Sequence, residues 1–224
     1  LVAVSAVVAV AVAVPRQVGK TKNINNILIK VSIMKKNHLI LIGIAVVVIV
    51  IFGWVKSTYN GMVGVEEEAT TALANVQSAY QRRADLIPNL VEVVKGYAAH
   101  EKETFESVVN ARAKATSITL DADNIEEFQK AQGELSSALG RLIAVGEAYP
   151  ELKANENFRE LQVQLEGTEN RINEERNKAN LKIQNYNISI RRFPSNLLAG
   201  MFGFEKMNKF EAEAGAEKAP QVKF

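Results

Sequence analysis

The chain has 224 residues, with 27 Lys and Arg, 25 Asp and Glu, two His and no Cys, a length typical of one domain with short appendages. The formal net charge is +2, but residues 1–33 hold four basic residues and no acid, so the rest of the chain carries a net charge of −2. This weak charge does not favour nucleic acid as a partner. The absence of Cys excludes disulfides, thiolate zinc sites, a cysteine nucleophile and a lipidated cysteine anchor.

The first 33 residues carry no recognisable structural signal. The opening repeat of Ala and Val is too short to cross a bilayer, which takes ~20 apolar residues, and it lacks the basic start of a signal peptide. Met34, followed by Lys35 and Lys36, makes better physical sense as a start. We therefore expect residues 1–33 to be an upstream extension without native structure, and residues 34–58 to be an N-terminal membrane anchor.

The anchor contains an uncharged, almost wholly apolar run from Leu39 to Val55. This run approaches the length of a membrane span, and Trp54 and Tyr59 stand where interfacial aromatic residues occur. No small-residue cleavage site follows it, so we predict a single uncleaved span rather than a signal peptide. Two lysines precede the run and Lys56 follows it, which weakly favours an extracytoplasmic location for the rest of the chain.

Residues 59–195 predict a helical domain, because Gly and Pro are sparse and apolar residues recur at three- and four-residue steps. Asp85 is expected to cap a second helix that has Pro88 in its first turn. The apolar positions of that helix, from 87 to 118, follow the heptad alternation of a coiled coil, with a weak middle at Glu101 and Thr104. The fold class is all-α: an antiparallel four-helix bundle preceded by one transmembrane helix.

Two further helices complete the predicted bundle. Asp123 and Glu126 form a reciprocal capping pair for the third helix, whose apolar face includes Gln132 and Gly146 and which ends before a proline. Asn155 is the expected cap of the fourth helix. Tyr97, Tyr149 and Tyr186 fall on apolar faces and are expected to be core tyrosines with one hydroxyl hydrogen bond.

Residues 196–224 are interpreted as an apolar segment followed by a disordered polar tail. Leu, Met and Phe concentrate before position 210. These residues are expected to pack back onto the bundle. The alternative is a short segment that touches the membrane surface, with Phe202 and Phe204 inserted.

Two stretches of the sequence resemble the LemA family of bacterial membrane-anchored proteins. The first is QRRADLIPNLV at 81–91, continued by VKGY and HE, and the second is AYPELKANENF at 148–158, followed by EGTENRI. The later pairs Tyr186-Asn187 and Phe193-Pro194 also fit, and the match covers about residues 34–204. The resemblance implies a single N-terminal span and a soluble four-helix bundle. It implies no catalytic residue, because none is established for the family.

The residues themselves give little support for catalysis or for a metal site. His100-Glu101 begins like a zinc-peptidase helix, but Thr104 stands where the second His is required. No inward-facing Glu-x-x-His pair is present for a di-iron site. We expect no enzyme activity, no cofactor and no metal.

The charged residues of the two stretches invite a partner-binding interpretation, although helix caps and salt bridges explain them as well. The candidate surface residues are Arg82, Arg83, Asp85, Glu151, Asn155 and Glu156. If both stretches are helix junctions of an antiparallel bundle, they lie at the same end of it and form one surface.

The sequence therefore predicts a non-catalytic cell-envelope scaffold or partner-binding module, held in the bacterial cytoplasmic membrane by one span, with its bundle on the extracytoplasmic side. Its partners are the membrane and an unidentified protein, not nucleic acid. The alternative is a self-assembling, membrane-organising structural protein, which leaves homo-oligomerisation open. A hydrolase is disfavoured.

Overall fold

The computed structural model describes residues 21–211, and the side chains of residues 38–211. The chain divides into two compact units, Leu1–Lys56 and Ser57–Phe224. No strand occurs within residues 21–211, so the all-α prediction is confirmed.

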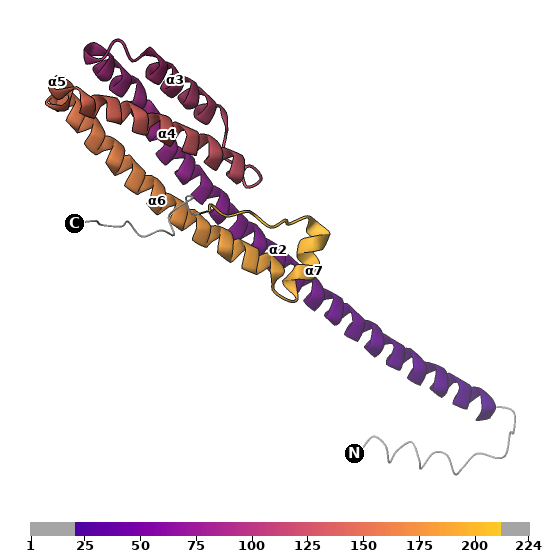
Figure 1. The fold of residues 1–224 in the computed structure, drawn as a ribbon. Coiled ribbons are helices and arrows are strands. Elements are labelled where there is room, and N and C mark those ends of the chain that lie inside the picture. Colours follow the sequence, from indigo (N-terminus) through magenta and orange to yellow (C-terminus); the bar gives the residue numbers. More distant parts are fainter. Residues whose placement is uncertain (1–20, 212–224) are drawn as a thin grey trace, which may run out of the picture. The chain divides into compact units, whose positions relative to one another are not determined.

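The first described element is helix α2, which runs from Thr21 to Tyr97 (Figure 1). Residues 21–33 are therefore helical, whereas the sequence predicted no structure for them; residues 1–20 lie outside the described part. Every side chain from His38 to Trp54 is exposed. The most apolar window of α2 has a mean hydropathy of 2.8 with none of its residues buried, so by length and composition it qualifies as a membrane span.

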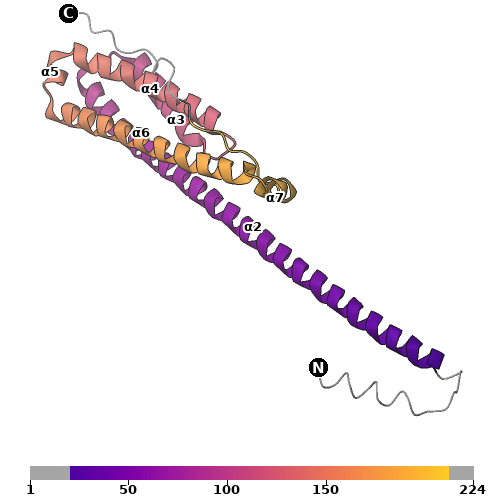
Figure 2. The same ribbon diagram turned by 90° about the horizontal axis from the view of Figure 1, so that it is seen from below.

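The second unit contains the rest of the described helices. These are α3 (Lys102–Ser117), α4 (Ile125–Ala148), the one-turn α5 (Pro150–Lys153), α6 (Glu156–Arg191) and α7 (Ser195–Phe202). Figure 2 shows α2, α4 and α6 running side by side in this unit, with α5 at the connection between α4 and α6.

Pairs of contacting residues give the helix directions. As numbers rise along α2 they fall along α6, in the pairs Glu68–Lys182, Arg83–Glu169 and Tyr97–Asn155. Helices α3 and α4 are antiparallel in the same way, in the pairs Ser107–Arg141 and Lys114–Glu134. Both of these helix pairs are therefore antiparallel.

The core of the second unit is apolar and draws on α2, α3, α4, α5 and α6. Its fully buried members include Leu90, Val108, Leu142, Leu152 and Phe158. Burying one such side chain stabilises the fold by about 1.5–3 kcal/mol. Gly146 of α4 lies against the Phe158 ring so closely that a Cβ atom there would overlap it, so this contact requires glycine.

The predicted boundary between the first two helices is wrong. Asp85 and Pro88 lie inside α2, and the break comes at residues 98–101 instead. Pro88 has no N–H for the carbonyl of Ala84, one turn earlier, but Arg112 of α3 donates its Nε–H to that oxygen at 2.8 Å. The chain therefore breaks at the weak part of the predicted heptad pattern and not at its proline.

Helix caps agree with the sequence in one case and differ in another. Asn155 caps α6 as predicted, since its Oδ1 accepts from the Phe158 N–H at 3.0 Å. The predicted Asp123 cap is wrong. Asn124 is the residue before α4, and its side chain turns back to the Asp121 N–H and the Thr119 carbonyl.

Residues 195–211 contact the rest of the second unit, as the sequence predicts, through Leu198, Ala199, Met207 and Phe210, which are buried. Helix α7 ends at Gly203, whose φ of +77° is a left-handed conformation that glycine adopts without strain. The following residues 204–211 have no regular secondary structure, and Met207 and Phe210 are buried. The expected disordered tail lies mostly beyond residue 211, outside the described residues.

Candidate functional site

Of the six predicted surface residues, three lie inside α2, about three to four turns before its end. Arg82 and Asp85 are exposed, and Asp85 accepts a hydrogen bond from Gln81 Nε2 at 2.8 Å. Arg83, between them, is buried and faces the core. These residues do not lie at a helix junction, because α2 continues to Tyr97.

The other three belong to a true junction, that of α4, α5 and α6. Glu151 and Glu156 are exposed, whereas Asn155 is engaged as the α6 cap and donates through Nδ2 to the Tyr97 hydroxyl at 3.0 Å. Asp85 and Tyr97 are separated by about 18 Å of helix at 1.5 Å per residue. The two stretches therefore do not share the end of the domain, and the partner-binding role of these residues stays a prediction.

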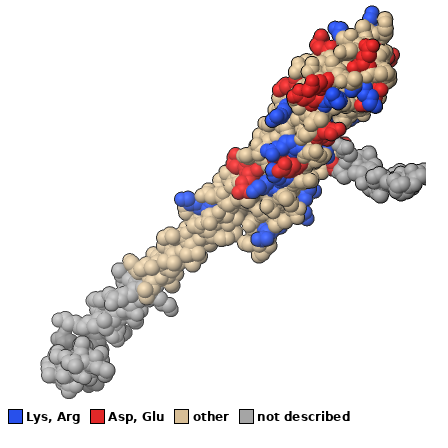
Figure 3. All heavy atoms as spheres, turned by 90° about the vertical axis from the view of Figure 1, so that its left-hand side faces the viewer, with Lys and Arg blue, Asp and Glu red and all other residues tan. Residues whose placement is uncertain are grey.

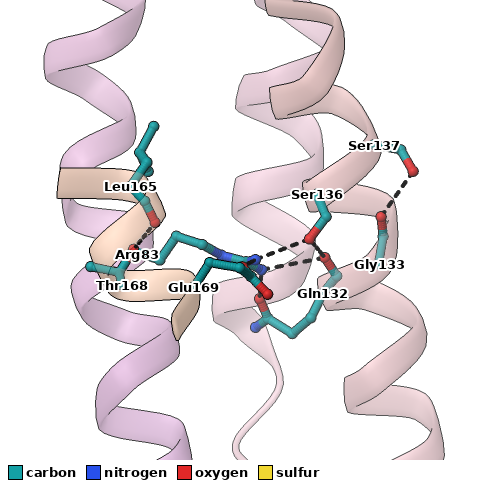
Figure 4. Close-up of polar contacts among 8 residues, drawn as sticks. All are labelled: Arg83, Gln132, Gly133, Ser136, Ser137, Leu165, Thr168 and Glu169. Carbon is teal, nitrogen blue, oxygen red and sulfur yellow. Dashed lines mark hydrogen bonds and ion pairs between the residues drawn. The ribbon is translucent and has the colours of Figure 1, made fainter. Parts of the chain in front are cut away.

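Arg83 is the centre of a buried polar cluster that joins three helices (Figure 4). Its Nη1 donates to Glu169 Oε2 of α6 at 2.8 Å and to Ser136 Oγ of α4 at 3.0 Å. Its Nη2 donates to Gln132 Oε1 at 3.0 Å. The Arg83 guanidinium carbon, Cζ, lies over the Tyr80 ring at 5.1 Å from the ring centroid.

The burial of Arg83 fixes what this cluster can do. Only 4% of its side chain is exposed, against 41% for Glu169. A guanidinium stays charged at all relevant pH values, so it is not a proton donor or acceptor in catalysis. Its Nε is the one buried side-chain polar atom without a hydrogen-bond partner in the described residues, and it is shut off from solvent. The cluster therefore holds α2, α4 and α6 together at a desolvated charge, and the Arg83 guanidinium offers no acid–base chemistry.

Beside the cluster lies an open groove of about 1430 Å³ between α4, α6 and residues 206–211. Its acidic lining residues are Glu126, Glu169 and Glu211. Its basic lining residues, besides Arg83, are Lys130, Arg176, Arg191, Arg192, Lys206 and Lys209. The groove is thus net basic, although the visible face in Figure 3 carries charges of both signs side by side.

The edge of this groove is a peptide segment, 205–211, that side-chain amides hold by its backbone. Asn187 both donates to the Met207 carbonyl, at 2.9 Å, and accepts from its N–H, at 3.0 Å. Asn180 makes the same pair of bonds with Phe210, and Gln129 makes them with Glu211. Arg176 Nη2 adds a bond of 2.6 Å to the Glu211 carbonyl. These contacts satisfy backbone groups that no strand partner pairs.

Tyrosine hydroxyls extend these polar contacts. Tyr186 is buried and donates to the Glu205 carbonyl at 2.8 Å, as expected of a core tyrosine. Burial, together with the nearby carboxylate of Glu66, raises the pKa of Tyr186 to about 12. Tyr97 differs from its prediction, since 42% of it is exposed.

The partners of Arg83 and the amides that hold residues 205–211 are not predicted from the sequence. One signal was present: Gln132 occupies a position in the apolar face of α4, and a polar residue there has to find a buried partner. Asn180 and Asn187 repeat the same signal, since they stand beside the buried Ala179, Ile183 and Tyr186. In the described side chains, residues 38–211, no group of three or more His, Asp or Glu could hold a metal ion.

Comparison with known proteins shows what the chain is similar to. A sequence model described as the LemA family matches residues 72–224. The chain is 27% identical over 189 residues to "Magnetosome protein MamQ" of Magnetospirillum gryphiswaldense, covering 73% of this chain and 70% of that protein. It is 26% identical to "Magnetosome protein MamQ 2" of Paramagnetospirillum magneticum, covering 71% and 66%. It is 24% identical to "Protein LemA" of Metamycoplasma hominis, covering 68% of each. The family model matches more than half of this chain, so the chain belongs to the LemA family.

Proposed function

We propose that this protein is a non-catalytic module that holds a partner protein at the bacterial cytoplasmic membrane. The observation that carries the proposal is the uncharged helical run 39–55, whose side chains are almost all exposed and have no core to cover them. An uninterrupted apolar helix of this length is costly in water and favourable in a bilayer. The second unit, with its apolar core and its buried Arg83 cluster, supplies a stable surface for the partner.

The relatives support a general role rather than one process. Two of them are named as magnetosome proteins and one is named only as LemA, yet all align with this chain at 24–27% identity. Alignment with proteins of such different names suits a module that is used in several settings.

The anchor is tested by fractionation of cells that express the full chain. Ile44→Lys with Val48→Lys places two charges in the run, each costing about 2.5–3.5 kcal/mol at the centre of a span. We expect the unmodified chain to stay in membranes through an alkaline wash and the variant to be released. The matched control, Ser78→Lys with Asn185→Lys, changes exposed residues of the second unit and should leave the chain in the membrane. An unmodified chain that washes off contradicts the proposal.

The side of the membrane is tested by labelling. Because the chain has no Cys, Asp123→Cys places a single thiol at an exposed position of the turn before α4. We expect a membrane-impermeant maleimide to label it in spheroplasts before lysis. Labelling only after lysis would place the second unit in the cytoplasm.

The partner surface is tested by charge reversal at its two separate parts. Arg82→Glu and Glu156→Lys change exposed side chains, so the fold should persist by circular dichroism. We expect at least one of them to abolish complexes that are cross-linked in cells. If both variants keep every complex, these residues do not form the surface.

A second candidate function, self-assembly, is favoured by the exposed apolar residues of α7. Leu197 and Met201 are 59% and 77% exposed, and apolar patches of this kind promote association. A self-assembling chain forms large species in sedimentation of the detergent-solubilised protein, and Met201→Ser reduces them. A scaffold without partners sediments as a monomer.

A further inference from the structure

Helix α7 presents an apolar face that no other described part of the second unit covers. Phe193 and Met201 are each 77% exposed, and Leu197, between them, is also exposed. Leu197 and Met201, four residues apart within α7, lie on one side of the helix, and Phe193 is exposed in the turn that precedes it. Leu198 and Ala199 face the other way and are buried. Helix α7 is thus apolar on two sides, and only one of them packs against the rest of the second unit.

The C-terminal end of α7 and the residues that follow it contact an aromatic residue near the predicted span. Tyr59 makes edge contacts with the rings of Phe202 and Phe204, at centroid distances of 4.9 and 5.6 Å. In the sequence, Tyr59 follows Val55, the last residue of the apolar run, by only four positions. Aromatic residues at this distance from a span belong to the belt at the membrane–water interface.

The charge around α7 suits an anionic lipid surface. Arg191 and Arg192 are exposed and directly precede it, and no acidic residue occurs from Arg176 to Phe204. Acidic residues return only at Glu205. Basic residues beside an apolar interfacial segment are attracted to anionic headgroups.

We propose that α7 lies in the interfacial layer of the bilayer, with Phe193, Leu197 and Met201 among the lipid chains and Arg191 and Arg192 at anionic headgroups. The inference rests on the proposed function, because it needs the membrane that residues 39–55 provide. It adds a second membrane contact, which would limit rotation of the second unit about its anchor. A second copy of the chain is the competing occupant of the same face.

The test uses the full chain reconstituted into vesicles of phosphatidylcholine, with and without phosphatidylglycerol. Met201→Cys introduces the only thiol and carries an environment-sensitive fluorophore. Ser137→Cys, exposed on α4, is the matched control site. Quenching by a nitroxide on the lipid chains is compared with quenching by aqueous iodide at each site. Flotation of the vesicles after an alkaline wash tests the anchor independently.

At Met201 we expect lipid quenching several times that at Ser137, with iodide quenching reduced. Phosphatidylglycerol should increase this difference. The double variant Arg191→Gln, Arg192→Gln should remove the increase, because each arginine is expected to strengthen binding to anionic headgroups about fivefold.

Other results contradict the proposal in distinguishable ways. Quenching at Met201 like that at Ser137, in a chain that floats with the vesicles, overturns the α7 contact and leaves the anchor intact. Protection from both quenchers, with cross-links between chains at Met201, assigns the face to a second copy instead. A chain that fails to float overturns the anchor and this inference together.

Discussion

Arg112 donates its Nε–H to the carbonyl oxygen of Ala84 at 2.8 Å, and this is the oxygen that Pro88 cannot reach with a backbone hydrogen. A proline inside a helix removes one hydrogen bond and crowds the carbonyl four residues earlier, at a cost of about 3 kcal/mol. Here a side chain from α3 supplies the missing donor, so α2 continues for more than two turns past the proline. The same bond fastens α3 to α2.

This relationship predicts a coupling between Pro88 and Arg112. Arg112→Met should destabilise the second unit by about 1.5–3 kcal/mol, because a carbonyl loses a charged donor. In a Pro88→Ala background the alanine N–H can bond to Ala84, so the same substitution should cost less. Urea unfolding of the four proteins in detergent measures the cycle.

The control for this cycle is Arg141→Met, which removes an exposed bond between α3 and α4 and should change stability by less than about 0.5 kcal/mol. Equal costs of Arg112→Met in both backgrounds would mean that the bond to Ala84 does not compensate for the proline.

Arg83 and its neighbour Arg82 should respond very differently to the same change. Arg83→Met leaves Gln132 and Glu169 without their buried donor, and we expect the free energy of unfolding to fall by about 2–4 kcal/mol. The loss should not exceed that of breaking a fully buried ion pair, because Glu169 still reaches water. Arg82→Met alters an exposed residue and should change stability by less than about 0.5 kcal/mol. Thermal unfolding of both variants decides the point. Similar losses would show that the burial of Arg83 has no energetic consequence.

Two glycines of α4 give opposite predictions. Gly146→Ala should destabilise the domain by about 1–3 kcal/mol, because the new methyl group meets the buried Phe158 ring. Gly133→Ala adds the same methyl group where nothing lies within 4 Å. It should stabilise by about 0.5–1 kcal/mol through helix propensity. Denaturant midpoints measured side by side test both signs, and a stabilising Gly146→Ala would contradict the packing described here.

The elements of this fold were more predictable than its polar contacts. Periodicity located α4 and α6 and the cap at Asn155, because those signals are local. The continuity of α2 through Pro88 was not predictable, since it depends on Arg112 from another helix. Similarly, charge alone suggested that Arg83 was exposed, and only its partners Gln132 and Glu169, distant in sequence, explain its burial.

The amide contacts to residues 205–211 should control the local stability of that segment. Asn187→Ala removes both bonds to Met207, a buried donor and a buried acceptor, so we expect fast hydrogen exchange at the Met207 N–H and faster proteolysis after residue 204. The global loss should be about 1–3 kcal/mol. Asn185→Ala, on the exposed side of the same helix turn, is the matched control and should change neither rate. Unchanged exchange at Met207 in the Asn187 variant would show that other contacts hold the segment.

Tyr186 gives the second unit a specific sensitivity to alkaline pH. Burial and the Glu66 carboxylate raise its pKa to about 12, above the value of 10.0 expected in the unfolded chain. Below pH 10 the phenol is neutral in both states and its contribution to stability is complete. Between pH 10 and 12 the unfolded state loses the proton first, so stability falls as pH rises. Lysines titrate in the same range, and the comparison with Tyr186→Phe removes their common effect. We expect the wild-type unfolding free energy to fall more steeply than that of the variant over this interval, and parallel curves would place the Tyr186 hydroxyl in a solvated environment.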